Sequence, residues 1–128
     1  MAHTENIHVV KALFAALAGS DIATAQTLIA DDISWLNSGL PTVRGRGVRR
    51  ILALMPKAGV GFAAKDFDFA DNGDGTVRFD RKDTLRWGPL GSTFFVSGTF
   101  QVRDGKVSRW DDRYRMGEVL GGFVRRSR

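Results

Sequence analysis

Two hydrophobic periodicities follow one another along this chain, and their order restricts the folds open to it. In the first half, apolar residues recur at the spacing of a helix, beginning with residues 5–18, where one apolar stripe consists of Ile7, Val10, Phe14 and Leu17. From Phe62 onward, apolar and polar residues alternate as they do in strands, and glycine-rich turn signals separate the segments. Helices followed by a run of long strands predict an α+β fold, with the helices packed on one face of a curved sheet.

The chain has 128 residues, which suits one domain with one core, spanning residues 1–128. A short second helix is expected after Asp21, which has the residue type of a helix cap, and a third helix after Gly45. The expected strands cover residues 33–37, 62–70, 76–87, a segment from Phe94 to Val102, and 106–116, with a turn over 88–91.

The segment 77–87 alternates so regularly that the residues on each of its faces can be assigned. Successive side chains of a strand point to opposite sides of the sheet. Phe79, Leu85 and Trp87 mark one face as the core side, and that same face carries Arg81 and Asp83. Because buried charges are costly unless they are paired, these two residues are a candidate site.

Two further strands place polar groups among bulky apolar neighbours. In the last strand, Asp112 shares a face with Trp110 and Tyr114. In the early extended segment, Asn37 shares a face with Trp35. The three inward faces together offer one guanidinium, one amide and two carboxyl groups.

Two interpretations of these charges are open. Arg81 and a carboxylate from Asp83 or Asp112 can form a structural salt bridge that serves packing alone. Alternatively, two carboxylates and one arginine leave a net negative charge, which an apolar site opposes. The two carboxyls are then expected to share a proton at neutral pH. Carboxyls in different protonation states are what acid–base catalysis requires.

Composition argues against several other kinds of site. The chain has no cysteine, and its histidines and carboxylates lack metal-ligand spacing, so neither a metal nor another cofactor is expected. The net charge of +5 comes from dispersed basic residues without an aromatic stacking platform, so no nucleic-acid partner is expected. There is no signal-peptide pattern and no apolar stretch near the ~20 residues that span a bilayer, so we expect a cytoplasmic location without a membrane partner.

Several short motifs in the second two-thirds of the chain match one known family. They are Asn37 followed by Pro41 and Gly45, Arg81-x-Asp83, Gly98-Thr99-Phe100-Gln101-Val102, Gly105-Lys106-Val107 and Trp110-Asp111-Asp112. From about Ile33 to Met116 the chain resembles the limonene-1,2-epoxide hydrolase family, which shares its fold with nuclear transport factor 2 and the SnoaL-like cyclases. The resemblance implies a cone-shaped α+β barrel, in which the N-terminal helices pack in the concave face of a strongly curved mixed sheet.

The resemblance also implies a role for each polar residue. Asp112 would be the general base that deprotonates a water held by Asn37, and Asp83 the general acid that protonates the epoxide oxygen. Arg81 would lie between the two carboxyls. The implied reaction converts a small lipophilic epoxide and water into a vicinal diol in one step, without a covalent intermediate. A homodimer is expected by analogy with folds of this kind.

One departure from the family pattern concerns the ligands of the water. The family places a tyrosine two residues before the asparagine, where this chain has Trp35, whose indole donates a hydrogen bond but accepts none. Two alternatives therefore stand beside hydrolysis: an epoxide-opening cyclase, in which a substrate hydroxyl replaces the water, and a non-catalytic protein that binds an apolar ligand. The residues expected to contact substrate or water are Trp35, Tyr114, Leu52, Leu85, Phe94, Val96 and Trp110.

Overall fold

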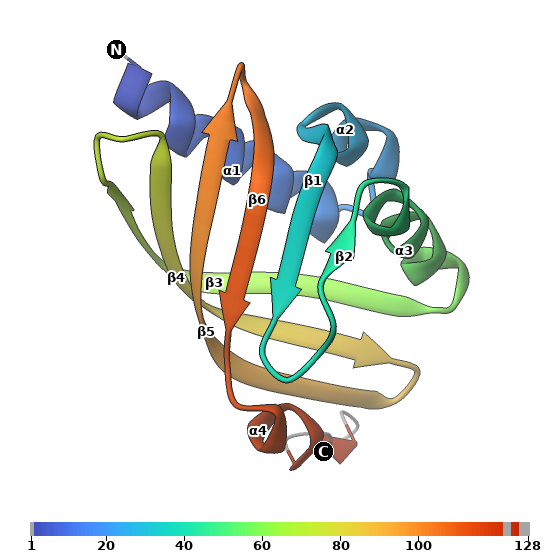
Figure 1. Ribbon diagram of the computed structural model, residues 1–128. Helices are drawn as coiled ribbons and strands as arrows, with labels where there is room; N and C mark the ends of the chain where they lie inside the picture. Colours follow the sequence, from blue (N-terminus) through green and yellow to red (C-terminus); the bar gives the residue numbers. More distant parts are fainter. Residues whose placement is uncertain (1, 122–123, 126–128) are drawn as a thin grey trace.

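Figure 1 shows the computed structural model. It describes the backbone of residues 2–121 and 124–125 and the side chains of residues 5–115, 117–119 and 121. A long N-terminal helix lies against a curved sheet. The helices are α1 (Ala2–Ala18), α2 (Ile22–Thr27), α3 (Arg46–Lys57) and α4 (Met116–Gly121). The strands are β1 (Ile29–Asn37), β2 (Val43–Arg44), β3 (Val60–Asp71), β4 (Thr76–Trp87), β5 (Leu90–Arg103), β6 (Lys106–Arg113) and β7 (Val124–Arg125).

The sheet is mixed and strongly curved. Its strand order is β2-β1-β6-β5-β4-β3, with β7 paired to β5, and the β1–β6 pair is parallel whereas the other pairs are antiparallel. β4 and β5 bend along their length, so the sheet curls around α1 (Figure 1). The cone-like α+β fold expected from the sequence is confirmed, with one correction: the sheet stays open between β2 and β3 and does not close into a barrel.

The core lies between α1 and the concave face of the sheet. Val10, Phe14 and Leu17 on one side of α1 are buried, as the helical spacing predicted, and Leu13 is buried with them. The Phe14 ring stands at the centre, with its centroid 4.8–5.7 Å from four other aromatic rings of the sheet. Removing this apolar surface from water is the main force that holds the helix in the curved sheet. Within the described ranges, no helix is both long enough and apolar enough to cross a membrane.

The second helix is capped as predicted. The Asp21 Oδ1 atom accepts a hydrogen bond of 3.2 Å from the backbone N–H of Thr24, at the start of α2. The preceding turn contains Ser20, whose φ of 55° lies in the left-handed region. This turn connects α1 to α2, and α2 leads directly into β1.

Among the boundaries that differ from the expectation are those of β1, β5 and β6. β1 begins at Ile29 rather than at residue 33, because a register shift between Ile29 and Ser34 lets the chain continue as a strand through two aspartates. The turn expected over 88–91 is tighter, because β5 already begins at Leu90. The last strand ends at Arg113, and Tyr114 therefore lies beyond the end of β6.

Trp87 was assigned to the core face of its strand, and this was wrong. It is 61% exposed, although the alternation of β4 places it on the same side as Phe79. Trp87 is the last residue of β4, next to the turn at Gly88, where the sheet extends beyond the helices that cover its concave face. The alternation along a strand shows on which face of the sheet a side chain lies. Burial also requires another element that packs against that face.

Candidate active site

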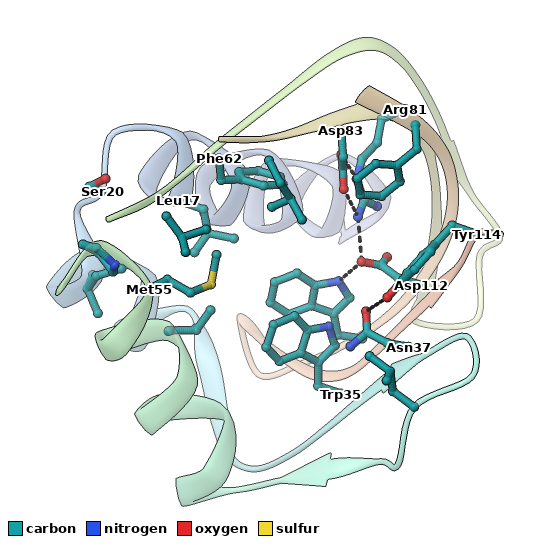
Figure 2. Close-up of a pocket in the computed structure, with 18 residues that line it drawn as sticks. Leu17, Ser20, Trp35, Asn37, Met55, Phe62, Arg81, Asp83, Asp112 and Tyr114 are labelled. Atoms are coloured by element: carbon teal, nitrogen blue, oxygen red, sulfur yellow. Dashed lines mark hydrogen bonds and ion pairs between the residues drawn. The ribbon is translucent and has the colours of Figure 1, made fainter. Parts of the chain in front are cut away.

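A cavity of about 270 Å³ lies between the end of α1, α3 and the concave face of the sheet. Most of its lining is apolar, and its polar side chains other than Ser20 gather toward one side (Figure 2). Leu17 and Met55 are on the opposite side, and Ser20 lies at its margin. The lining residues are Leu17, Ser20, Ile22, Trp35, Asn37, Leu40, Leu52, Met55, Pro56, Val60, Phe62, Arg81, Asp83, Leu85, Phe94, Trp110, Asp112 and Tyr114.

Arg81 joins the two carboxyls at the polar side of the cavity. Its Nε donates to Asp83 Oδ1 at 2.8 Å, and its Nη2 donates to Asp83 Oδ2 at 3.1 Å and to Asp112 Oδ2 at 2.7 Å. The side chain of Arg81 is 0% exposed, and those of Asp83 and Asp112 are 7% exposed. The three charges thus form one buried cluster, although β4 and β6 contribute to it from positions 31 residues apart.

Aromatic rings surround the guanidinium on the side facing the core. The Arg81 Cζ atom lies 4.4 Å from the Phe14 ring centroid, 5.0 Å from that of Phe79 and 5.8 Å from that of Phe100. The negative face of an aromatic ring attracts a cation, and the attraction is stronger when water is excluded. These rings stabilise a charge that would otherwise be costly to bury.

Burial perturbs both carboxyl groups in the same direction. Desolvation raises the pKa of Asp83 to about 6, against the opposing effect of Arg81. Desolvation also raises the pKa of Asp112, again opposed by Arg81 and by the hydrogen bond from Trp110. Perturbed carboxyls beside an apolar cavity are characteristic of acid–base sites.

The parallel pairing of β1 and β6 brings the amide to the carboxyl. Asn37 is the register partner of Asp112, so their side chains emerge side by side. The Tyr114 hydroxyl donates to Asn37 Oδ1 at 3.1 Å (Figure 2), which fixes the orientation of the amide. Ser38 ties the two strand ends together, since its N–H donates to the Asp112 carbonyl and its Oγ accepts from the Tyr114 N–H.

The same pairing stacks two tryptophans beside the cluster. Trp35 is the register partner of Trp110, and their ring centroids are 4.6 Å apart at an interplanar angle of 22°. The Trp110 Nε1 donates to Asp112 Oδ2 at 2.9 Å. The Trp35 Nε1 is buried and has no hydrogen-bond partner among the described residues. Both indoles line the cavity, with Trp110 also holding the carboxyl in place.

Most residues singled out from the sequence lie around this cavity. Arg81, Asp83 and Asp112 form the charged cluster. Val96 was expected to contact substrate or water, but it does not line the cavity and packs in a second buried cluster with Phe94 and Val119. The remaining candidates that line the cavity are Trp35, Asn37, Leu52, Leu85, Phe94, Trp110 and Tyr114.

Several contributors were not singled out from the sequence. Phe14 was assigned to the core stripe of the first helix without its contact to Arg81, and Ser38 carried no recognisable signal. The helical stripe of α1 predicted that Leu17 faces inward, but not that it borders a cavity. Across the described residues, no group of three or more His, Cys, Asp or Glu side chains is placed to hold a metal ion.

This chain is similar in sequence and fold to known proteins. Residues 4–125 match the family model for the limonene-1,2-epoxide hydrolase catalytic domain. Epoxide hydrolase EphG of Mycobacterium tuberculosis is 32% identical over 116 residues, which cover 91% of this chain and 77% of that protein. The solved structure of an M. tuberculosis LEH-like epoxide hydrolase matches with a TM-score of 0.88 and 32% identity, covering 95% of this chain and 91% of the other. An NTF2-like protein from Burkholderia xenovorans LB400 shares the fold, with a TM-score of 0.75, 23% identity and coverage of 94% and 96%.

Proposed function

The chain belongs to the limonene-1,2-epoxide hydrolase family, and from this premise we propose that it adds water to a small lipophilic epoxide to give a vicinal diol. The observation that carries the proposal is the Arg81 side chain, buried in the cavity wall between the carboxyls of Asp83 and Asp112. Opening an epoxide requires a nucleophile at one ring carbon and a proton for the departing oxygen. Two carboxyls that hold one proton between them supply both in a single step, without a covalent intermediate.

The neighbours of the two carboxyls support different roles for them. Asn37 lies beside Asp112, and this amide is the group suited to hold a nucleophilic water. In the proposed step, the water oxygen attacks an epoxide carbon while Asp112 takes one of its protons. The ring C–O bond breaks, and Asp83 gives its proton to that oxygen. Arg81 contacts both carboxyls throughout and limits the build-up of negative charge.

Tyr114 compensates in this proposal for the tryptophan at position 35. Because the Tyr114 hydroxyl donates to Asn37 Oδ1, the amide is left with its Nδ2 group as the donor for a nucleophile. The hydroxyl thus fixes the water ligand from beyond the end of β6, although it is not itself at the position where the family has its tyrosine. Leu52, Leu85, Phe94 and the stacked Trp35 and Trp110 are proposed to contact the apolar part of the substrate.

The hydrogen-bonding groups around the nucleophile also favour a second candidate, an epoxide-opening cyclase. A nucleophile beside Asn37 and Asp112 meets one acceptor, the carboxylate, and one donor, the Asn37 Nδ2. Trp35, which stands where the family has a tyrosine, supplies no acceptor. A substrate hydroxyl has a single proton and matches this set, whereas a water has a second proton that finds no acceptor among these three side chains.

Labelled water distinguishes these candidates. The purified protein is incubated in H₂¹⁸O with limonene-1,2-epoxide, cyclohexene oxide, styrene oxide and an epoxy alcohol whose hydroxyl can reach its own ring. Diol that carries one ¹⁸O atom, formed faster than without protein, supports the hydrolase. An unlabelled cyclic ether from the epoxy alcohol alone supports the cyclase. No conversion of any compound, with retained binding of an apolar epoxide, contradicts both and supports a ligand-binding protein.

The remaining expectations about partners stay predictions. The proposed reactants are the epoxide and water, with no cofactor. A homodimer and a cytoplasmic location are proposed by analogy with proteins of this fold.

A further inference from the structure

Gly98 of β5 occupies a position where a side chain would collide with the charged cluster. The inward positions on either side of it carry Val96 and Phe100, both 0% exposed. A Cβ atom added at Gly98 would lie 2.7 Å from Arg81 Nη1, 2.8 Å from Phe100 Cε1 and 2.9 Å from Asp112 Oδ1. Non-bonded atoms strongly repel one another at such distances, well inside the 3.5–4.0 Å optimum for carbon atoms.

Backbone conformation does not explain the glycine. Among the described residues, seven other glycines have a positive φ, which favours glycine, and Gly98 is not one of them. It lies within the regular antiparallel ladder, opposite Phe79 of β4 and Asp112 of β6. The glycine therefore supplies space rather than conformational freedom.

The three neighbours of Gly98 have little room to move away from a methyl group. Arg81 is held by hydrogen bonds to two carboxyls and lies over the Phe14 ring. Asp112 is held by Arg81 and by the Trp110 indole. The Phe100 ring packs against those of Phe14 and Trp110. A methyl group at position 98 can be accommodated only by displacing this packed set or the strand itself.

We propose that Gly98 is a positioning residue of the site: the space above its Cα lets the Arg81 guanidinium and the Asp112 carboxyl meet across β5. Replacing it with alanine lengthens the contact between Arg81 Nη2 and Asp112 Oδ2, now 2.7 Å. Because Arg81 lowers the pKa of Asp112, a longer contact raises that pKa further. The proposed effect on geometry stands alone, whereas its effect on turnover rests on the proposed function.

The first test does not depend on activity. Protein labelled with ¹³C at the aspartate carboxyl carbons is titrated by NMR as wild type and as Gly98→Ala, and the Asp112 signal is assigned by its loss in Asp112→Asn. We expect the Asp112 carboxyl to titrate about one pH unit higher in Gly98→Ala. Superimposable titration curves for the two proteins overturn the proposal.

Gly61→Ala is the matched control. Gly61 lies in β3 of the same sheet, opposite Arg86, and a Cβ there would lie 3.6 Å from the Arg86 Cβ, an ordinary contact. Its backbone likewise needs no positive φ. We expect its carboxyl titration to match that of the wild type. An equal shift in both variants means that any strand glycine has this effect, and the proposal fails.

The second test measures turnover of limonene-1,2-epoxide. In Gly98→Ala we expect kcat to fall about 10²-fold while KM stays within about twofold, because misplacement of catalytic groups by about 1 Å has an effect of this size. We also expect the acidic limb of the kcat/KM profile to move to higher pH. Unchanged kcat with a changed KM contradicts a positioning role. If the wild type turns over no epoxide, the proposed function fails, and the NMR titration still decides the role of Gly98.

A stability cycle covers the case in which Gly98→Ala folds poorly. Asp112→Ala removes the carboxyl and with it one of the three colliding atoms. We therefore expect Gly98→Ala to lower Tm less in the Asp112→Ala background than in the wild type, or to fold only in that background. Equal losses of Tm in both backgrounds, or failure to fold in both, mean that the strand and not the ion pair requires the glycine, which overturns the proposal.

Discussion

Strand β4 carries the same Arg-x-Asp spacing on each of its two faces. On the inner face, Arg81 Nε lies 2.8 Å from Asp83 Oδ1, and the side chains are 0% and 7% exposed. On the outer face, Arg78 Nε lies 3.3 Å from Asp80 Oδ2, and the side chains are 47% and 22% exposed. The two pairs share residue types, spacing and strand, and they differ in what covers them.

This comparison shows that burial, not the motif, makes the candidate site. The outer pair is screened by water and salt, and pairs of that kind contribute about 0–1 kcal/mol to stability. The inner pair is shielded from water, so its Coulombic interactions are stronger and its desolvation is costly. That cost is also what raises the pKa of Asp83 into the range useful for proton transfer near neutral pH.

The largest expected difference between the faces comes from Asp112→Asn compared with Asp111→Asn. Asp112 faces the cavity, whereas Asp111 pairs with Arg109 and Arg113 at 3.7 and 3.6 Å on the other face. We expect kcat for limonene-1,2-epoxide to fall about 10³-fold in Asp112→Asn and to stay within about twofold in Asp111→Asn. Steady-state kinetics, with circular dichroism to check folding, measure this. Near-normal turnover in Asp112→Asn shows that the base has been misassigned.

The next difference compares Arg81→Lys with Arg78→Lys, which keep the charge on each face. An ammonium group cannot bind Asp83 through two nitrogens and also reach Asp112, so the inner cluster loses its geometry. We expect kcat/KM to fall about 10²-fold and Tm to fall clearly in Arg81→Lys alone. Similar changes in both variants indicate that positive charge at any point of β4 suffices.

The next comparison is between the pH dependence of the free energy of unfolding in Asp83→Asn, on the inner face, and in Asp80→Asn, on the outer face. The folded-state pKa of Asp83, about 6, lies above its usual value of 3.8 in an unfolded chain, so the native state binds this proton more tightly. Protonation of Asp83 therefore adds to the free energy of unfolding. This contribution, about 3 kcal/mol, is fully present below about pH 4 and is lost as pH rises through about 6. Asp83→Asn is expected to remove that decline, as measured by urea unfolding between about pH 4 and pH 7.5.

Asp80→Asn serves as the outer-face control for that measurement. Because Asp83 is unchanged in this variant, its free energy of unfolding is expected to keep the wild-type decline between about pH 4 and pH 6. If the curve of Asp83→Asn also runs parallel to the wild type, the inner carboxyl does not titrate as proposed.

The smallest expected effect is that of Tyr114→Phe, which removes a single hydroxyl from the polar side of the cavity. Loss of the 3.1 Å hydrogen bond frees the Asn37 amide to rotate. We expect kcat to fall about two- to tenfold, the effect of one neutral hydrogen bond, with Tm nearly unchanged. A loss as large as that of Asp112→Asn gives Tyr114 a direct part in proton transfer instead.

Much of the inner face could be predicted from the sequence. The bounds of β4 at residues 76–87 were predicted correctly, and Arg81 and Asp83 lie on its buried side. Alternation is a local property of an extended chain, so it was reliable in the middle of the strand. It failed at Trp87, where burial depends on which elements cover the end of the sheet.

The contacts that these residues make with other strands could not be predicted from local sequence patterns. Each inward face was identified separately, but the contact between Arg81 and Asp112 depends on the curvature that carries β4 and β6 around α1. The neighbouring positions of Asn37 and Asp112 depend on a parallel register between strands at opposite ends of the chain. Local periodicity contains no information about which strands pair, because pairing depends on contacts made by the whole fold.

The sequence by itself determined which side chains share a face, and it therefore identified two carboxyls, an arginine and an amide as inward polar groups. Only the tertiary structure decided that these groups converge at one side of an apolar cavity, that Tyr114 reaches Asn37, and that the space above Gly98 accommodates Arg81 and Asp112. The physical reason is the range of the interactions. The face of a strand on which a side chain lies follows from the geometry of neighbouring residues. Burial, ion pairs and the space beside Gly98 depend on segments far apart in the chain.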